Sequence, residues 1–277
     1  MDKERLDPQE RTGVFTSGVV STKEGRKIAL FFTGQRHAGE NLAEVLKARA
    51  AELETPIQMC DALSRNMPEE LKVIVSNCIA HSRRKFVDVV ESFPSECRYV
   101  LETLGKVYKI DARARKEELS AQGRLELHRR DSGPLMEKLH RWLKHEIEEK
   151  RVEPNSGLGE AITYALNHWE KLTRFLEVPG APLDNNVCER ALKKAILHRK
   201  GSLFFKTQNG ARVGDTFMSL IYTCQLQGVD PFDYLNALQS HAEALAAKPK
   251  EWMPWSYKET LARLGASQPA SGEEPRR

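Results

Sequence analysis

Apolar residues recur at two different spacings along the chain, and the first third shows the spacing of strands. Short runs rich in β-branched residues alternate apolar and polar positions there, and turn-forming residues separate them. We expect strands at residues 13–21, 26–34, 56–63 and 71–81. The turn Lys23-Glu24-Gly25 makes the first two an antiparallel hairpin. A helix at 39–54, with Leu42, Val45, Leu46 and Arg49 on one side, leads to the other two, so the four strands predict a mixed sheet with helices packed on it.

From Ser82 to Leu176 the spacing changes to that of helices. Leu, Ile and Trp residues recur every three or four positions within residues 134–150 and 157–177. We interpret these two stripes as core rather than as a cofactor site. Their residues are Leu135, Leu139, Trp142, Leu143, Leu158, Ile162, Leu166, Trp169 and Leu172. Further helices are expected at about residues 187–199 and after Asp230-Pro231, which is a helix start signal.

Loops rich in Pro, Gly and Asn at residues 152–157 and 178–186, together with polar ends, suggest the domain organisation. Trp252 and Trp255 are expected to anchor a short segment of the otherwise disordered tail. The expected parts are a frayed N-terminus at 1–12, the first part of an α/β core at 13–82, a helical region at 83–178, a C-terminal region with the helix of Glu189 at 179–247, and a mostly disordered tail at 248–277.

Composition and charge narrow the class of protein only slightly. The 277 residues are 40% apolar, enough for one large domain or two smaller ones, and the net charge is only +4. The segment from Arg190 to Lys206, however, contains six Lys or Arg, one His and no acid. Such a run is usually a solvated face, and it also suits a phosphate backbone. Five scattered cysteines and the lack of a long apolar run predict a soluble, cytoplasmic protein.

Two acids stand out from their surroundings. Asp61 ends an apolar strand, where burial of an unpaired carboxylate is costly. It either caps the next turn or projects from the carboxyl end of the strand into a cleft, where α/β sheets place ligands. Glu189 lies in the first turn of a basic helix, after three good N-cap residues, where an acid complements the helix dipole. Those N-cap residues are Asp184, Asn185 and Asn186.

Four motifs follow one another in an order that resembles a known family. They are IQMCDAL at 57–63, NCIAHSRRKF at 77–86, LDNNVCERALKKAILHRK at 183–200 and GVDPFDYLNAL at 228–238. From roughly Thr12 to Trp255 the chain resembles the IS66-type insertion-sequence transposases. The resemblance implies an α/β fold, an RNase H-like mixed sheet with a large all-helical insertion and a helical C-terminus. It also implies a DDE-type transposase, in which two Asp and one Glu hold the divalent ions that cut and rejoin DNA.

The resemblance assigns roles to individual residues. It implies that Asp61 is the second acid and Glu189 the third, and that both are catalytic ligands of Mg²⁺ or Mn²⁺, hard ions that prefer carboxylate oxygen. It implies that basic residues hold DNA, namely Arg83, Arg84, Lys85, Arg190, Lys193, Lys194, Arg199 and Lys200. His81, Asn185 and Asn186 are implied to lie near the cleft. Cys78 and His81 also have the spacing of half a zinc site, although no second pair accompanies them.

The sequence departs from the family pattern in two ways. The family's first catalytic Asp lies on a strand before the hairpin, whereas Asp2 and Asp7 lie outside any apolar strand, and Gly201 stands where the family usually has Asn. The chain therefore resembles a truncated, C-terminal catalytic part of a transposase.

Three functions remain open. The first is metal-dependent DNA strand cleavage and transfer. The second is a non-catalytic DNA-binding fragment that inhibits or pairs with an intact transposase. The third is a helical interaction protein whose basic run is only solvated. For the first two, the expected partners are the insertion-sequence ends and target DNA, with a homo-oligomer or an intact transposase and no membrane.

Overall fold

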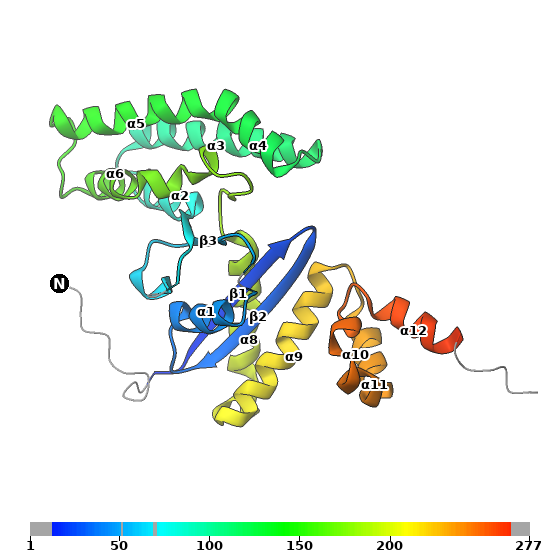
Figure 1. Ribbon diagram of the computed structural model, residues 1–277. Helices are drawn as coiled ribbons and strands as arrows, with labels where there is room; N and C mark the ends of the chain where they lie inside the picture. Colours follow the sequence, from blue (N-terminus) through cyan, green and yellow to red (C-terminus); the bar gives the residue numbers. More distant parts are fainter. Residues whose placement is uncertain (1–12, 51, 69–70, 267–277) are drawn as a thin grey trace, which may run out of the picture. The chain divides into compact units, whose positions relative to one another are not determined.

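The computed structural model describes residues 13–50, 52–68 and 71–266, which group into two compact units. The first unit contains residues 13–36 and 187–266, and the second contains residues 37–186. Both combine a two-stranded sheet with helices, and helices predominate (Figure 1). The protein is therefore α/β, as the sequence predicts. The frayed start expected at residues 1–12, with Asp2 and Asp7, lies outside the described residues.

An antiparallel hairpin opens the first unit. β1 (Phe15–Lys23) pairs with β2 (Arg26–Gly34), and Phe15 lies opposite Gly34 at the open end. Between the strands, Glu24 and Gly25 have φ angles of 51° and 77°. Positive φ at both central residues is the geometry of the type I′ turn, whose twist matches that of a hairpin. The predicted hairpin is confirmed.

Two helices cover one face of this hairpin. α8 (Asn186–Gly201) and α9 (Gln208–Leu226) are joined through the 3₁₀ turn η5 (Leu203–Lys206). Ala191 and Ala195 of α8, one turn apart, pack with Ala29, Phe31 and Tyr222 in a small core. Because the α8 residues are alanines, the helix can approach the strands closely.

Polar side chains of α9 also cover the outer edge of β2. Residues spaced by four along the helix bind the backbone of alternate strand residues, because four helical residues and two strand residues both rise about 6–7 Å. The pairs are Asp215 with the Thr33 N–H (2.5 Å), Ser219 with the Phe31 N–H (3.0 Å), Thr223 with the Ala29 N–H (3.1 Å) and Gln227 with the Lys27 carbonyl (3.0 Å). We call this arrangement the edge ladder. It satisfies backbone groups that an edge strand otherwise exposes.

The C-terminal helices form a second small core of the first unit. They are α10 (Pro231–Ser240), α11 (Ala242–Ala247), the 3₁₀ turn η6 (Pro249–Trp252) and α12 (Tyr257–Ala266). The Asp230 carboxylate accepts hydrogen bonds from the N–H groups of Phe232 and Asp233, which confirms the predicted helix start. Trp252 is buried with Cys224, Tyr234 and Tyr257 and so anchors this segment. Residues 267–277 lie outside the described residues.

A short parallel pair of strands lies near the start of the second unit. After α1 (Ala38–Lys47), β3 (Ile57–Cys60) and β4 (Ile74–Asn77) pair from Ile57↔Ile74 to Cys60↔Asn77, with the 3₁₀ turn η2 (Ser64–Asn66) between them. In the described residues the four strands thus form two separate two-stranded sheets, and the single mixed sheet expected from the sequence is not observed. Side chains bind backbone groups at one outer edge of each pair: the edge ladder covers β2, and the Arg174 guanidinium donates to one carbonyl of β4, that of Val75 (3.3 Å).

Three predicted boundaries are wrong. The third strand, expected to reach residue 63, ends at Cys60. The helix expected at 39–54 ends at Lys47, and the Arg49 guanidinium instead binds the carbonyls of Leu53 and Glu54. The fourth strand, expected to reach residue 81, ends at Asn77, because Cys78 caps α2 (Ile79–Asp88). Residues 79, 82 and 86 are buried, a helical spacing that follows directly on the apolar run of the strand.

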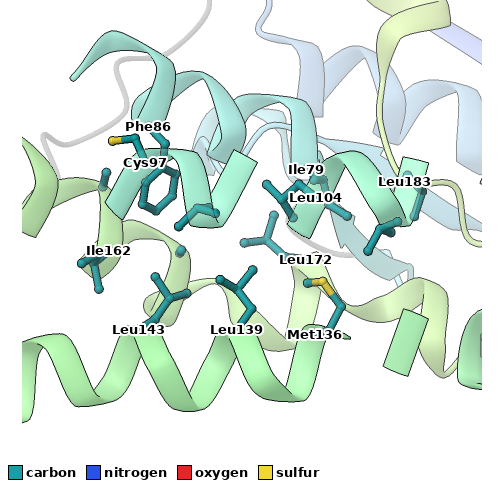
Figure 2. Close-up of a cluster of buried hydrophobic side chains, with 14 of the residues drawn as sticks. Ile79, Phe86, Cys97, Leu104, Met136, Leu139, Leu143, Ile162, Leu172 and Leu183 are labelled. Carbon is teal, nitrogen blue, oxygen red and sulfur yellow. The ribbon is translucent and has the colours of Figure 1, made fainter. Parts of the chain in front are cut away.

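Helices make up the remainder of the second unit. They are α3 (Pro94–Lys116), α4 (Ala121–Leu127), the π-helical turn η3 (His128–Ser132), α5 (Gly133–Glu148), α6 (Gly157–Asn167), α7 (Trp169–Leu172) and the 3₁₀ turn η4 (Arg174–Leu176). Figure 2 shows Leu139 and Leu143 pointing from α5 into the interior that Phe86, Ile162 and Leu172 also fill. The two predicted stripes therefore do supply core residues.

A buried polar network lies among these helices. Asp111 is 4% exposed, and its carboxylate binds the guanidinium groups of Arg124 and Arg115 and lies 3.2 Å from His128 Nε2. The other ring nitrogen of His128 lies 2.9 Å from the Ser132 hydroxyl. The π-helical turn carries both His128 and Ser132. Burial alone would raise the pKa of Asp111, but the His128 hydrogen bond and the two arginines outweigh it, so the pKa is lowered.

Candidate functional site

Asp61 is the first residue after β3. Its Oδ1 atom accepts hydrogen bonds from the Leu63 N–H (3.4 Å) and from the Asn66 side-chain amide. The first interpretation is confirmed, because Asp61 caps the following turn. Asp61 also lies at the carboxyl end of a parallel strand, and its projection into a cleft stays a prediction. Within the described residues, Oδ2 of Asp61 has no hydrogen-bond partner. Hydrogen bonds to one oxygen of the carboxylate therefore fix the side chain.

The surroundings of Asp61 are partly buried and contain a phenol and a thiol. Burial, and then the Asp61 charge, raise the pKa of Tyr164 on α6. The same two causes, burial first, raise the pKa of the Cys60 thiol to about 11. The Lys85 ammonium lies 4.7 Å from the centre of the Tyr164 ring. Asp61 and Lys85, from different elements, therefore converge on Tyr164.

The start of α2 lies at the same end of the parallel pair. The Cys78 N–H donates to the Cys60 carbonyl (3.0 Å), which places Cys78 beside the end of β3. The Asn185 N–H donates to Cys78 Sγ (3.4 Å) and the Ile79 N–H to the Leu183 carbonyl (3.0 Å). These bonds attach the loop before α8 to the start of α2. His81 follows one turn later on α2 and is half-buried.

Arg83 and Arg84 lie on the exposed face of α2. The sequence places them directly after the fourth strand, whereas the structure places them in the second turn of the helix. Together with neighbouring residues they line a hollow of about 400 Å³. Asn186, one of the residues expected near the cleft, also lines it, and its N–H donates to the Asp184 carboxylate (3.1 Å).

Glu189 lies in the first turn of α8, as predicted, and is half-buried. The preceding Cys188 donates its thiol hydrogen to the Gly18 carbonyl of β1 (3.2 Å). Burial, and to a lesser extent Glu189, raise the pKa of this thiol to about 11. The first turn of α8 is therefore attached to the hairpin of the first unit, and this attachment positions Glu189 relative to β1.

The basic side chains of α8 differ in exposure and in their contacts within the first unit. Arg190, Lys193 and Lys200 are exposed. Lys194 donates to the Gln225 side-chain carbonyl (3.3 Å) and lies over the Tyr222 ring, and Arg199 donates to the Val14 carbonyl (3.2 Å). Two of the five residues thus also have structural contacts within the first unit.

The predicted site residues are divided between the two units. Asp61, His81, Arg83, Arg84, Lys85, Asn185 and Asn186 belong to the second unit, and Glu189, Arg190, Lys193, Lys194, Arg199 and Lys200 belong to the first. A shared metal site of Asp61 and Glu189 stays a prediction. The sequence analysis missed Tyr108 and Tyr164, because a Tyr in an amphipathic helix is normally interpreted as a core residue. Only the structure shows that these two side chains lie beside charged groups.

The described residues thus form an α/β protein with an acid at the carboxyl end of a parallel strand and with basic residues on α2 and α8. The chain matches the model of the Transposase IS66 family over residues 14–213. It belongs to that family.

Curated relatives carry no functional description. The chain is similar to the uncharacterized proteins y4jD and y4qI of Sinorhizobium fredii (strain NBRC 101917 / NGR234), with 33% identity to each over 187 residues. The matches cover 65% and 66% of this chain and 35% and 34% of the relatives, so the chain spans about a third of their length. No solved structure matches. None of the described helices is long and apolar enough to cross a membrane.

Proposed function

We propose that this chain is the catalytic part of a DDE-type transposase, which cleaves and transfers DNA strands in a metal-dependent reaction on an RNase H-like core. The family match over residues 14–213 carries the proposal. The parallel pair supports it, because β3 ends directly before Asp61, the acid that the family resemblance implies as a ligand.

Asp61 and Glu189 are the proposed metal ligands. The chemistry of the donors fits Mg²⁺ or Mn²⁺, since both ions prefer carboxylate oxygen, and Oδ2 of Asp61 accepts no hydrogen bond from the described residues. When bound, a divalent ion would activate the attacking water or 3′-OH and would stabilise the negative charge on the departing oxygen. Asn66 and the Leu63 N–H hold the Asp61 carboxylate in one orientation, and Cys188 attaches the turn that carries Glu189.

Eight basic residues of α2 and α8 are proposed to bind phosphates without reading sequence. These residues are Arg83, Arg84, Lys85, Arg190, Lys193, Lys194, Arg199 and Lys200. If six of them contact phosphates, the logarithm of DNA affinity should fall with the logarithm of salt concentration at a slope of about −5. His81, Asn185 and Asn186 are proposed to lie near the reacting strand.

The test is nicking of supercoiled DNA in Mg²⁺ or Mn²⁺, followed as conversion to open circles. We expect nicking by the unmodified chain and none by Asp61→Asn or Glu189→Gln, because each replaces a carboxylate by an amide of similar shape. Asp88→Asn, which changes an exposed acid of α2, is the matched control and should nick normally.

DNA binding measured in the same preparations separates the two main hypotheses. Binding that is equal in all variants, with no nicking by any protein, contradicts the enzymatic proposal. It favours instead a DNA-binding fragment that inhibits or pairs with an intact transposase. Failure to bind any DNA, whatever the salt concentration, contradicts both.

A further inference from the structure

We infer that the exposed face of α2 forms a subsite for one phosphate of a DNA backbone, with Tyr108 as a third donor beside Arg83 and Arg84. This inference rests on the proposed function, because it takes DNA as the ligand. Residues spaced by three and four along α2 share one face and line the hollow of about 400 Å³. The lining residues are Ala80, Arg83, Arg84, Val87, Tyr108 and Asn186.

Within the described part of the second unit, no ion pair neutralises the charge of the two arginines. Among the described residues, neither Arg83 nor Arg84 has a carboxylate oxygen within 4.0 Å. Arg124 and Arg174 of the same unit, by contrast, are both ion-paired. Two adjacent guanidinium groups in a hollow match the planar, bidentate geometry by which arginine binds phosphate oxygens.

Tyr108 adds a neutral donor to this pair of charges. Its hydroxyl oxygen is buried and has no hydrogen bond of ordinary geometry with the described residues. Burial raises the pKa of this phenol, the charge of Asp184 and a hydrogen bond to its carboxylate raise it further, and Arg83 acts in the opposite direction. The phenol therefore keeps its proton at neutral pH and can donate it in a hydrogen bond. The contact with Asp184 does not have ordinary hydrogen-bond geometry, so a phosphate oxygen in the hollow offers the phenol a better-placed acceptor.

Asp184 is the acid at this site, and it limits what can bind. Its carboxylate accepts from the Asn186 N–H, so it is already partly neutralised by the start of α8. Two guanidinium groups against one carboxylate leave one positive charge, which suits a phosphodiester with one negative charge better than a dianion. The hollow is also larger than one phosphate needs and open to solvent, so the adjoining sugars can pass through it. The ligand chemistry is therefore a phosphate within a nucleic acid chain.

The experiment measures binding of a short DNA duplex to the full chain in EDTA by fluorescence anisotropy over a range of salt concentrations. In Arg83→Ala/Arg84→Ala we expect the salt slope to become less steep by about 1, the value for one lost phosphate contact. In Tyr108→Phe we expect about tenfold weaker binding, because only a hydrogen bond to a charged group is removed.

Matched controls lie on neighbouring helices. Arg98→Ala/Arg141→Ala removes two exposed charges, from α3 and α5, and Tyr99→Phe removes a hydroxyl from α3, the helix of Tyr108. Arg98 is ten residues from Tyr108, about 15 Å along the helix axis. If the paired arginine variants weaken DNA binding equally, or if Tyr108→Phe binds as tightly as Tyr99→Phe, the subsite is refuted.

A titration with inorganic phosphate distinguishes the two sources of the anion. If Arg83→Ala/Arg84→Ala loses the binding of free phosphate but keeps the DNA affinity of the wild type, the subsite binds free phosphate and the assignment to DNA is overturned. Because EDTA removes divalent ions, this measurement does not depend on cleavage. A chain that never nicks DNA can still show the subsite, and a chain that nicks DNA can still lack it.

Discussion

The edge ladder makes a quantitative prediction at Thr223. Its hydroxyl accepts from the Ala29 N–H (3.1 Å) and donates to the Ala29 carbonyl (3.4 Å), and Ala29 is 0% exposed. Thr223→Val keeps the shape of the side chain but removes both hydrogen bonds. Each buried backbone group left without a partner costs about 1–3 kcal/mol. Since the second bond is long, we expect a total loss of about 2 kcal/mol.

Hydrogen exchange followed by mass spectrometry provides a local measurement. A loss of 2 kcal/mol corresponds to exchange about 30-fold faster in peptides that cover β2, if the strand opens locally. Thr216→Val is the matched control, because Thr216 lies on the same helix, is exposed and donates only to the Arg212 carbonyl of its own helix. Equal protection of β2 in the two variants would refute the view that α9 side chains hold the strand edge.

Three further predictions concern the second unit. Asp111→Asn should lower the stability of the second unit by about 3 kcal/mol at neutral pH. Since folding lowers the pKa of Asp111, the greater stability of the wild type is present above pH 3.8 and is lost as the pH falls through the folded-state pKa. Urea unfolding of both proteins at several pH values checks this. Gly39→Ala should strongly destabilise the second unit, because a Cβ there would lie 2.2 Å from the Met67 carbonyl oxygen. Gly105→Ala should instead stabilise α3 by about 0.5–1 kcal/mol, because a Cβ there meets nothing within 4 Å. Thermal unfolding compares the two variants. Ile162→Ala, at a position with 0% exposure, should cost about 3–4 kcal/mol in urea unfolding, and a loss below 1 kcal/mol would contradict its place in the core.

Local signals in the sequence were sufficient for several elements. The alternation on both sides of Glu24-Gly25 predicts the hairpin, Asp230-Pro231 predicts the start of α10, and the Leu stripes predict the core of the second unit. Each depends on residues close in sequence. The position of Asp61 at the end of β3 is of the same kind.

Features that depend on distant residues could not be read in this way. The edge ladder joins α9 to β2 across more than 180 residues, and Arg174 reaches Val75 from 99 residues away. Strand propensity alone cannot show that side chains of helices, rather than another strand, contact the outer edges of β2 and β4. The hollow similarly combines α2 with Tyr108 and Asn186, and no spacing in the sequence connects them.

The order of the two units along the chain has a consequence for folding. The second unit is continuous, whereas the first is assembled from residues 13–36 and 187–266. The hairpin leaves the ribosome early, but α8 and α9 follow only after about 150 further residues, and closing a flexible loop of that length costs about 4 kcal/mol. Because residues 37–186 form a compact unit of their own, folding of that unit first shortens the flexible part of this loop. We therefore expect residues 37–186 to fold during synthesis, and the hairpin to wait for α9 as the slow, chaperone-dependent step.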